Sequence, residues 1–416
     1  MKRVLVSLAL VAISTLLALG LGELAVRALY KDQTVMFPRY HTDYRYGAYT
    51  LRGIRPNARF RHTSVDGSWE FVTNSKGLRD RREFAYEKPS GTLRVLSLGD
   101  SHTQGYEVRQ DATYSAVLER YLVRHGVRAQ VLNAGVSGFS TAEALAFLEN
   151  EGYKYEPDVV VLGFYANDFE DNLKAGLFAL KGDELVARKH EHLPGVHVQN
   201  LVYSLPGVRW LSENSYFYSL LFNGVWLYFK STLRAHAVEQ AATHSASAHP
   251  SGLEYAVATK ADYSGYEVAL ALALIERMQR FCREHGMRLI VVDIPRPAGP
   301  YELRESLPAS AVQRVGGAPP ELIDSRALLG EVDGVAEMHL PGGHRHISEL
   351  THTAIGLELG RRILQGGPPS PSRSVAAPQA LRVDRAFATG AKHEPDPGRL
   401  PIAGDKVNAA APAAAR

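Results

Sequence analysis

The chain is predicted to fold as an α/β protein built on a doubly wound parallel sheet with helices on both faces. Two observations predict this class. Short apolar runs of β-type residues alternate with longer segments of helical period, and glycine or polar residues follow three of the apolar runs. The carboxyl ends of parallel strands border a crevice, where we expect a binding site. The expected strands cover 93–98, 129–133, 158–163 and 288–294, and the expected helices lie near 112–125, 141–151, 266–285 and 348–364.

The first 30 residues are expected to form a signal-anchor or transmembrane helix. Lys2 and Arg3 precede an apolar run from Val4 to Gly22, and the first acidic residue is Glu23. About 20 such residues span a bilayer core as a helix, and the flanking positive charges favour an inside amino end. The rest of the chain would then face outward, on the periplasmic or extracytoplasmic side. A cleaved signal peptide is the alternative, but no convincing small-x-small site precedes Glu23 and the helical pattern continues beyond it.

Changes in composition divide the remainder of the chain. Residues 31–90 are rich in Tyr, Arg and Gly, with short β-prone runs, and should form a small β-containing extension. Residues 91–365 should form the main domain, with an insertion at 172–264 that breaks the strand and helix rhythm. Within the insertion, the aromatic segment Tyr216–Phe229 is expected to be either a buried helix or a lid or membrane-facing surface. Residues 366–416 are rich in Gly, Pro, Ser and Ala and are expected to be a disordered tail.

Overall composition limits the class of protein further. The 416 residues, 45% of them hydrophobic, suffice for one large α/β domain with additions. A formal net charge of +3 is too small to indicate a nucleic acid partner. Cys282 is the single cysteine, so the chain has no internal disulfide, which fits either side of a membrane.

The most informative motif is a serine directly after the first strand of the main domain. The strand ends at Gly99, Asp100 and Ser101, and a serine in this position can direct its hydroxyl into the crevice. Turns favour these residue types for backbone reasons, so the triplet alone is weak evidence. Three later segments strengthen it: Asn-Ala-Gly-Val-Ser-Gly at 133–138, Gly-Phe-Tyr-Ala-Asn-Asp at 163–168, and His-Ile-Ser-Glu-Leu-Thr-His at 346–352.

These residue types suit acyl transfer, which needs a nucleophile, a base and donors for a developing oxyanion. Ser101 can act as the nucleophile and His346 as the base, because the unperturbed pKa of imidazole lies near physiological pH. The backbone N–H groups of Ser101 and Gly138, with the side-chain amide of Asn167, form the expected oxyanion hole. Glycine at 138 allows close backbone approach to the reacting oxygen.

In these four segments the chain resembles the SGNH hydrolases, also called GDSL esterases and lipases. The resemblance covers about residues 91–365 and implies the flavodoxin-like SGNH hydrolase fold. It also implies that Ser101 is the nucleophile, that Gly138 and Asn167 are the second-block and third-block residues, and that His346 is the base. A stretch before the main domain resembles membrane-anchored bacterial members of the family, at Asn74, Gly77, Leu78, Arg79 and Asp80.

The chain departs from this family at the acid that orients the histidine. Family members have an aspartate two or three residues before it, whereas this chain has His344 and Gly343 there. Asp333 or Glu337 could fold back to supply the carboxylate. Otherwise a backbone carbonyl holds the imidazole and the centre is a Ser101–His346 dyad. Both possibilities remain open from the sequence.

His339 is an alternative base, because residues 339–344 also resemble a fourth block. Ser348, His352 and the helix from Thr353 follow His346 at spacings closer to the family pattern, which favours His346. The neighbouring histidines could instead bind a metal, but no partner cysteines or regular spacing support a zinc site. We therefore expect neither a metal nor a cofactor.

Asp100 and Asp168, beside the expected site, could be mistaken for a paired acid and base. Bonding to loop backbone is the favoured interpretation of both carboxylates.

Together these features predict a membrane-anchored, outward-facing serine esterase or acylhydrolase. Its expected partners are an ester or acylated glycan substrate and the membrane, with no nucleic acid. The same machinery could pass the acyl group to a sugar hydroxyl, so a polysaccharide O-acyltransferase or deacetylase is the first alternative. The missing acid also allows an inactive relative that binds glycan or scaffolds an envelope complex.

Overall fold

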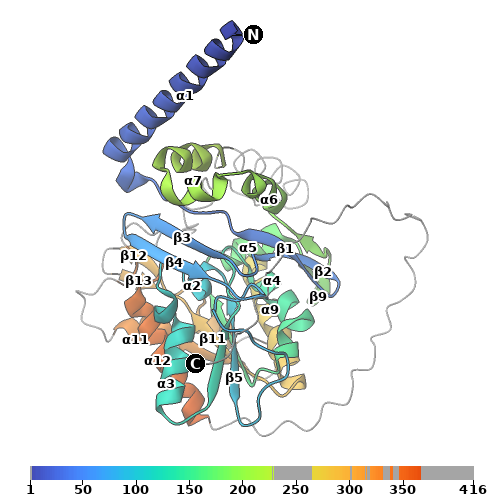
Figure 1. Ribbon diagram of the computed structural model, residues 1–416. Helices are drawn as coiled ribbons and strands as arrows, with labels where there is room; N and C mark the ends of the chain where they lie inside the picture. The colour runs from blue at the N-terminus through green and yellow to red at the C-terminus, as the bar shows by residue number, and fades with distance from the viewer. Residues whose placement is uncertain are drawn as a thin grey trace, which may run out of the picture. The chain divides into compact units, whose positions relative to one another are not determined.

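The computed structural model describes residues 2–226, 228, 265–299, 302–313, 315, 319–330, 338–340 and 346–366. At its centre lies a five-stranded sheet in which all neighbouring strands are parallel (Figure 1). The spatial order is β14-β11-β7-β5-β6. It reverses beside β5, as in flavodoxin-like sheets, and confirms the predicted fold class. The strands are β5 (Leu93–Gly99), β6 (Ala129–Asn133), β7 (Val159–Phe164), β11 (Arg288–Asp293) and β14 (Glu321–Asp324).

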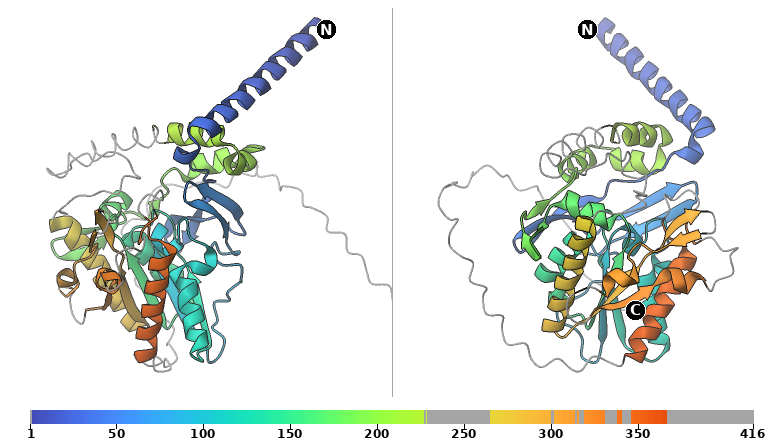
Figure 2. Two further views of the ribbon diagram at one scale, coloured as in Figure 1. Left: turned by 90° about the vertical axis from the view of Figure 1, so that its left-hand side faces the viewer. Right: turned by 180° about the vertical axis from the view of Figure 1, so that it is seen from behind.

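Helices cover both faces of this sheet, because successive strand residues point to opposite sides and both sides are apolar. Val95 and Val161 lie in the core beneath α3 and α12, whereas Leu96 and Leu162 lie in the core beneath α4 and α9. Figure 2 shows α3 and α12 side by side. Gly356 permits this approach, since a Cβ there would lie 2.8 Å from the Tyr114 carbonyl oxygen. The helices are α3 (Tyr114–Arg124), α4 (Thr141–Asn150), α5 (Asp168–Ala175), α9 (Gly265–Glu284) and α12 (Glu349–Gln365).

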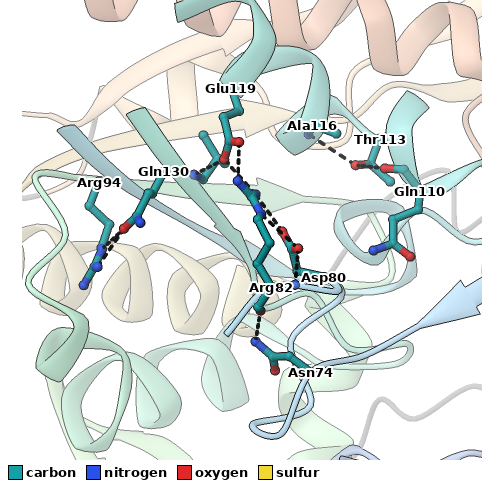
Figure 3. A network of polar contacts seen from close by, with 10 residues as sticks. Asn74, Asp80, Arg82, Arg94, Gln110, Thr113, Ala116, Glu119 and Gln130 are labelled. Carbon is teal, nitrogen blue, oxygen red and sulfur yellow. Dashed lines mark hydrogen bonds and ion pairs between the residues drawn. The ribbon is translucent and has the colours of Figure 1, made fainter. Parts of the chain in front are cut away.

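The extension consists of two antiparallel hairpins that pack above the carboxyl ends of the sheet (Figure 1). Its last part is tied to the main domain by Arg82, which Figure 3 shows between Asp80 and Glu119 of α3. Arg82 donates to Asp80 at 2.8 Å and to Glu119 at 2.7 Å, and Glu119 also accepts from Val131 N of β6. The strands are β1 (His41–Tyr46), β2 (Tyr49–Ile54), β3 (Arg59–Ser64) and β4 (Gly67–Val72).

The amino-terminal helix α1 (Lys2–Leu29) is long and apolar enough to cross a membrane, with a mean hydropathy of 2.6 in its most apolar window. It projects away from the rest of the described chain in Figures 1 and 2. Among the described residues, its last turns contact the folded part of the chain: Val26 packs with Met36 and Tyr216. The helix therefore continues past the apolar run, as the sequence predicts.

The described part of the insertion contains a hairpin, β8 and β9, followed by three short helices near α1. A helix covers 216–226 within the aromatic segment, while residues 227 and 229–264 lie outside the described chain, as does the predicted tail from 367 onward. The labelled elements are β8 (Phe178–Lys181), β9 (Glu184–Ala187), β10 (Glu191–His192), α6 (Val196–Ser204) and α7 (Val208–Asn214). The remaining elements are η1 (Lys31–Gln33), η2 (Gln110–Ala112), η3 (Gly152–Tyr155), β12 (Arg296–Gly299), β13 (Glu302–Arg304), α10 (Ala309–Val312) and α11 (Ser325–Gly330).

Candidate active site

Ser101 begins a one-turn helix, α2 (Ser101–Gln104), immediately beyond the end of β5. Asp100 caps this helix, its side chain accepting from His102 N at 2.8 Å. The turn is possible because residue 99 is glycine with φ +146°, where a Cβ would lie 2.7 Å from the Gly163 carbonyl oxygen. Ser101 therefore lies at the carboxyl edge of the sheet, beside the point where the strand order reverses.

The Ser101 hydroxyl lies within hydrogen-bond distance of an imidazole that follows 245 residues later in the sequence. Ser101 Oγ is 2.8 Å from His346 Nε2. The His346 ring stacks on Tyr106, with centroids 4.3 Å apart, and lies 4.8 Å from the His102 ring. If His346 carries its proton on Nδ1, Ser101 donates to Nε2, which is the arrangement that a general base requires.

Backbone contacts next to His346 set its position. Its carbonyl oxygen accepts from Leu340 N at 2.8 Å, and Ile347 bridges to His339. Ser348 then caps α12 by accepting from Thr351 N. These contacts hold His346 between a β-bridge and a helix start.

His339, the alternative base, hydrogen-bonds to a backbone carbonyl through Nε2. Its Nε2 lies 3.0 Å from the Pro295 carbonyl oxygen, so this nitrogen must carry a proton to donate there. The structure thus pairs Ser101 with His346. Asp333 and Glu337, the possible orienting acids, lie outside the described residues, as do Gly343 and His344.

Gly138 lies in the loop after β6, which is attached to the Ser101 turn. Val136 N donates to the Gly99 carbonyl at 3.0 Å, and the Ser137 hydroxyl bonds to the Gln104 side chain. Gly138 itself has φ +78°, a conformation that favours glycine. A Cβ at this position would also lie 2.7 Å from Arg52 Nη2.

Asn167 follows β7 and directly precedes α5. Its Nδ2 donates to Asp171 Oδ2 at 2.9 Å, and its side chain also hydrogen-bonds to Asp100. Because β5, β6 and β7 are neighbours in one parallel sheet, the loops that carry Ser101, Gly138 and Asn167 meet at the same edge. Their joint role as an oxyanion hole remains a prediction.

Replacing Asn167 with alanine is expected to lower kcat about 10²- to 10³-fold, because one oxyanion donor is lost. Asp171→Ala removes the Asn167–Asp171 hydrogen bond and an exposed ion pair with Lys174 but keeps the Asn167 amide, and should lower kcat about tenfold or less. Steady-state kinetics on a chromogenic ester compare the two variants. Equal losses would refute a direct contact between Asn167 and the reacting oxygen.

The carboxylates of Asp100 and Asp168 are buried and bond to loop backbone, as the sequence interpretation favoured. Asp168 accepts from Tyr165 N and from the Thr141 hydroxyl, each at 3.0 Å. Burial, with the added charge of Asp171, raises the pKa of Asp100 to about 7 despite the hydrogen bond from His102 N. Burial and the charge of Asp100 likewise raise the pKa of Asp168 well above its usual range.

This raised pKa predicts a pH-dependent stability. The folded state holds the Asp100 proton more tightly than the unfolded chain, whose pKa is 3.8, so stability present at low pH is lost as pH rises through about 7. Asp100→Asn keeps the cap and cannot ionise. Between pH 4 and pH 8, the free energy of unfolding of this variant should therefore rise by roughly 2 to 4 kcal/mol relative to that of the native protein. Calorimetry should show this as a higher unfolding temperature of the variant relative to the native protein at pH 8 than at pH 4. Parallel pH profiles for the two proteins would refute this assignment.

Arg79 lies behind α2 and was not assigned a role from the sequence. It is buried, and it donates to the carbonyl oxygens of Gln104 at 2.6 Å, Gly105 at 2.5 Å and Val108 at 2.6 Å. Burial lowers the pKa of its guanidinium to about 9. Arg79 thus satisfies carbonyl groups at the end of the helix that carries Ser101.

A second unassigned group, Tyr106 and Glu107, borders the imidazole of His346. Glu107 is buried and lies 3.2 Å from His62 Nε2 of β3, whose ring contacts Tyr106 edge-on. Burial acts to raise the pKa of Glu107, but the hydrogen bond and charge of His62 outweigh it and lower that pKa. The extension therefore contributes side chains directly beside the ring that supports His346.

Arg52 and His192 converge on one buried carboxylate near Gly138. His192 Nδ1 lies 3.0 Å from Glu143 Oε1, and Arg52 Nε lies 3.6 Å from the same oxygen. The extension, the insertion and α4 each supply one of the three residues. No sequence spacing connects them, so only the fold reveals this cluster.

Comparison with known proteins identifies the class of this domain. Residues 97–299 match the GDSL-like lipase/acylhydrolase family, a class of hydrolases that act on esters. This match confirms the resemblance to GDSL esterases and lipases that the sequence shows.

Individual relatives match less of the chain. An arylesterase from Vibrio mimicus is 33% identical over 75 residues, which is 18% of this chain and 38% of that protein. A lipase/acylhydrolase structure from Enterococcus faecalis is 17% identical, with a TM-score of 0.37, over 67% of this chain and all of that one. The psychrotrophic esterase EstA from Pseudoalteromonas sp. is 13% identical, with a TM-score of 0.35, over 66% of this chain and 97% of its own.

Proposed function

We propose that this protein is a serine esterase or acylhydrolase whose reactive centre is Ser101 and His346. The observation that carries the proposal is the 2.8 Å separation of Ser101 Oγ and His346 Nε2. The two residues are 245 positions apart in the sequence, so no local turn or helix brings them together. The match of residues 97–299 to a family of ester-acting hydrolases indicates that the reaction of this pair is ester cleavage.

The reaction proceeds in two halves. Ser101 Oγ attacks the ester carbonyl carbon while His346 Nε2 takes the hydroxyl proton. The negative oxygen of the tetrahedral intermediate accepts hydrogen bonds from the N–H groups of Ser101 and Gly138 and from Asn167 Nδ2. The intermediate then collapses, and the leaving alcohol receives the proton from His346. Water, deprotonated by His346, attacks the acyl-enzyme and releases the acid and the free serine.

The imidazole needs a support on its other side. Stacking on Tyr106 fixes the plane of the His346 ring, and the proton on Nδ1 is held by a backbone carbonyl or by the carboxylate of Asp333 or Glu337. A weakly oriented histidine still accepts a proton, with a lower rate.

We further propose that α1 is an uncleaved anchor that leaves the catalytic domain on the periplasmic side. Its length and apolar composition suit a membrane span, and Lys2 and Arg3 suit an inside amino end. Glu23 and Arg27, in its last turns, bond to residues 214–217 of the folded domain, so this end of the helix belongs to that domain. Mass spectrometry of the membrane-extracted protein tests the proposal; loss of the first 22 residues would reject it.

Candidate ester substrates, which include O-acetyl groups on a glycan, are tested by a hydrolysis assay. The purified full chain is incubated with short-chain aryl esters and with acetylated oligosaccharides, with and without an unacetylated acceptor glycan. Released acid that does not depend on the acceptor supports the hydrolase. Acceptor-dependent transfer that is faster than hydrolysis would instead establish the O-acyltransferase. No turnover in either format, together with no fluorophosphonate labelling of the native protein, would support the inactive glycan-binding protein.

A further inference from the structure

The three short helices of the insertion expose large apolar side chains in a regular pattern. Val198 and Leu201 are three apart on α6, and Leu205 directly follows the end of this helix. Leu221 and Val225 are four apart on the helix over 216–226. Residues at such spacings share one face of a helix. Trp210 of α7 is 64% exposed and Leu201 is 67% exposed. We call these side chains the apolar platform, which consists of Val198, Leu201, Leu205, Trp210, Leu221 and Val225.

The opposite face of α6 is bound to the rest of the protein. Asn200 accepts from Arg55 Nη2 at 2.6 Å, and the Tyr203 ring lies 4.2 Å from the Arg55 guanidinium carbon. Val196 and Gln199 are buried on this side. The exposed stripe of α6 therefore faces away from the hairpins of the extension.

The other two helices are held in the same manner. Arg61 Nη2 donates to Asn214 Oδ1 at 2.8 Å, and Arg209 Nη2 donates to the Arg59 carbonyl at 2.5 Å. On the helix over 216–226, Asn223 accepts from Arg39 Nη2 at 2.9 Å. These contacts attach both helices to the domain. On α7, Ser212 is buried whereas Trp210 is exposed, so Trp210 lies on the outer side with the rest of the apolar platform.

The platform is joined to α1 at the point where the apolar run of that helix ends. Glu23 accepts from Phe217 N at 2.9 Å and from the Ser215 hydroxyl at 2.7 Å. One residue earlier, a Cβ at Gly22 would lie 3.0 Å from the Phe217 ring. Figures 1 and 2 show α6 and α7 at the foot of α1, between that helix and the sheet domain.

We propose that the apolar platform lies on the membrane surface and is a second membrane contact of this protein. The inference rests on α1 spanning the bilayer, which is part of the proposed function. If Val4–Gly22 fill the hydrocarbon core, the membrane surface passes near Glu23, the level at which the helix over 216–226 begins. Tryptophan and leucine on helices that lie parallel to the surface are typical of interfacial attachment. The domain is thereby held at a fixed orientation to the bilayer.

Single-cysteine labelling in nanodiscs tests this contact in the full chain. An environment-sensitive fluorophore is attached at Leu201→Cys, Trp210→Cys or Leu221→Cys, and its emission is compared in plain and brominated phosphatidylcholine. Leu16→Cys, within the apolar run, reports whether α1 enters the bilayer. Val123→Cys is the matched control, because Val123 is also an exposed apolar residue but belongs to α3, which Figure 1 shows well away from α1. The native Cys282 is buried, so the unmodified protein gives the labelling background.

We expect emission at 201, 210 and 221 to shift to shorter wavelength and to lose intensity with brominated lipid, and emission at 123 to do neither. Quenching at 16 without quenching at 201 and 221 overturns the platform and leaves the anchor intact. Quenching at 201 and 221 but not at 16 supports the surface contact and rejects the spanning helix. A wavelength shift without quenching places a second protein copy on the platform and overturns the proposal. Unfolding temperatures equal to that of the native protein show that the variants are folded.

Discussion

Replacing Ser101 with alanine is expected to abolish covalent labelling by a fluorophosphonate probe and to lower kcat/KM for ester hydrolysis about 10⁴-fold or more. The probe reacts with an activated serine hydroxyl, which the variant lacks. His346→Gln should cause a loss of similar size, since Ser101 Oγ then has no base at 2.8 Å. Because the two residues act as a unit, the double variant should be little worse than either single variant.

His339→Gln is the matched control for the base. Its amide can still donate to the Pro295 carbonyl, so labelling and kcat/KM should stay within about threefold of the native protein. The reverse pattern, with His339→Gln inactive and His346→Gln active, would transfer the role of the base to His339. Labelling of Ser101→Ala at the native rate would show that Ser101 is not the nucleophile.

The sheet and the three loops on it could be predicted because their signals are local. Val159–Leu162 is a continuous apolar β-type run, and a strand buried on both faces needs such a run. Once the strands are parallel, the residues after them must share an edge, which is why Ser101, Gly138 and Asn167 could be grouped in advance. The four-residue strand β14 was not predicted, because its apolar run is only two residues long and is flanked by Glu321 and Asp324.

The choice between His339 and His346 could not be made on spacing alone. Both histidines lie in loop sequence before the same helix, and family spacing favours His346 without showing which ring turns toward Ser101. In the fold, the bridge between His339 and Ile347 and the cap at Ser348 decide it, and these are contacts between backbone groups. The support from Tyr106 escaped prediction for a similar reason, since stacking depends on side-chain direction rather than on residue order.

Arg79 illustrates a role that only the tertiary structure defines. The sequence marked Arg79 as part of a family-like stretch, but its three acceptors lie 25 to 29 residues further along the chain. No periodicity connects an arginine in an extension with carbonyl groups at the end of a distant one-turn helix. Burial of a guanidinium is costly, so its three hydrogen bonds must offset that cost.

Replacing Arg79 with methionine is expected to lower the free energy of unfolding by about 4 kcal/mol, a large part of the stability of a typical domain. Three buried carbonyl groups lose a charged donor, and the guanidinium also leaves its place 4.5 Å over the Phe71 ring. Chemical denaturation followed by circular dichroism measures the change. Because α2 carries Ser101, fluorophosphonate labelling should slow under conditions in which the variant is still folded.

Arg82→Met, three residues away, separates this effect from a general loss of positive charge. Arg82 is half exposed and pairs with Asp80 and Glu119, so its removal should cost about 1 kcal/mol or less and leave labelling unchanged. The two arginines of this loop would then differ several-fold in their contribution to the free energy of unfolding. The difference would follow from their burial and not from the number of their partners. Equal destabilisation by the two substitutions would contradict the role of Arg79 in holding the end of α2. It would show that the positive charge of the loop, and not the hydrogen bonds of Arg79, stabilises the fold.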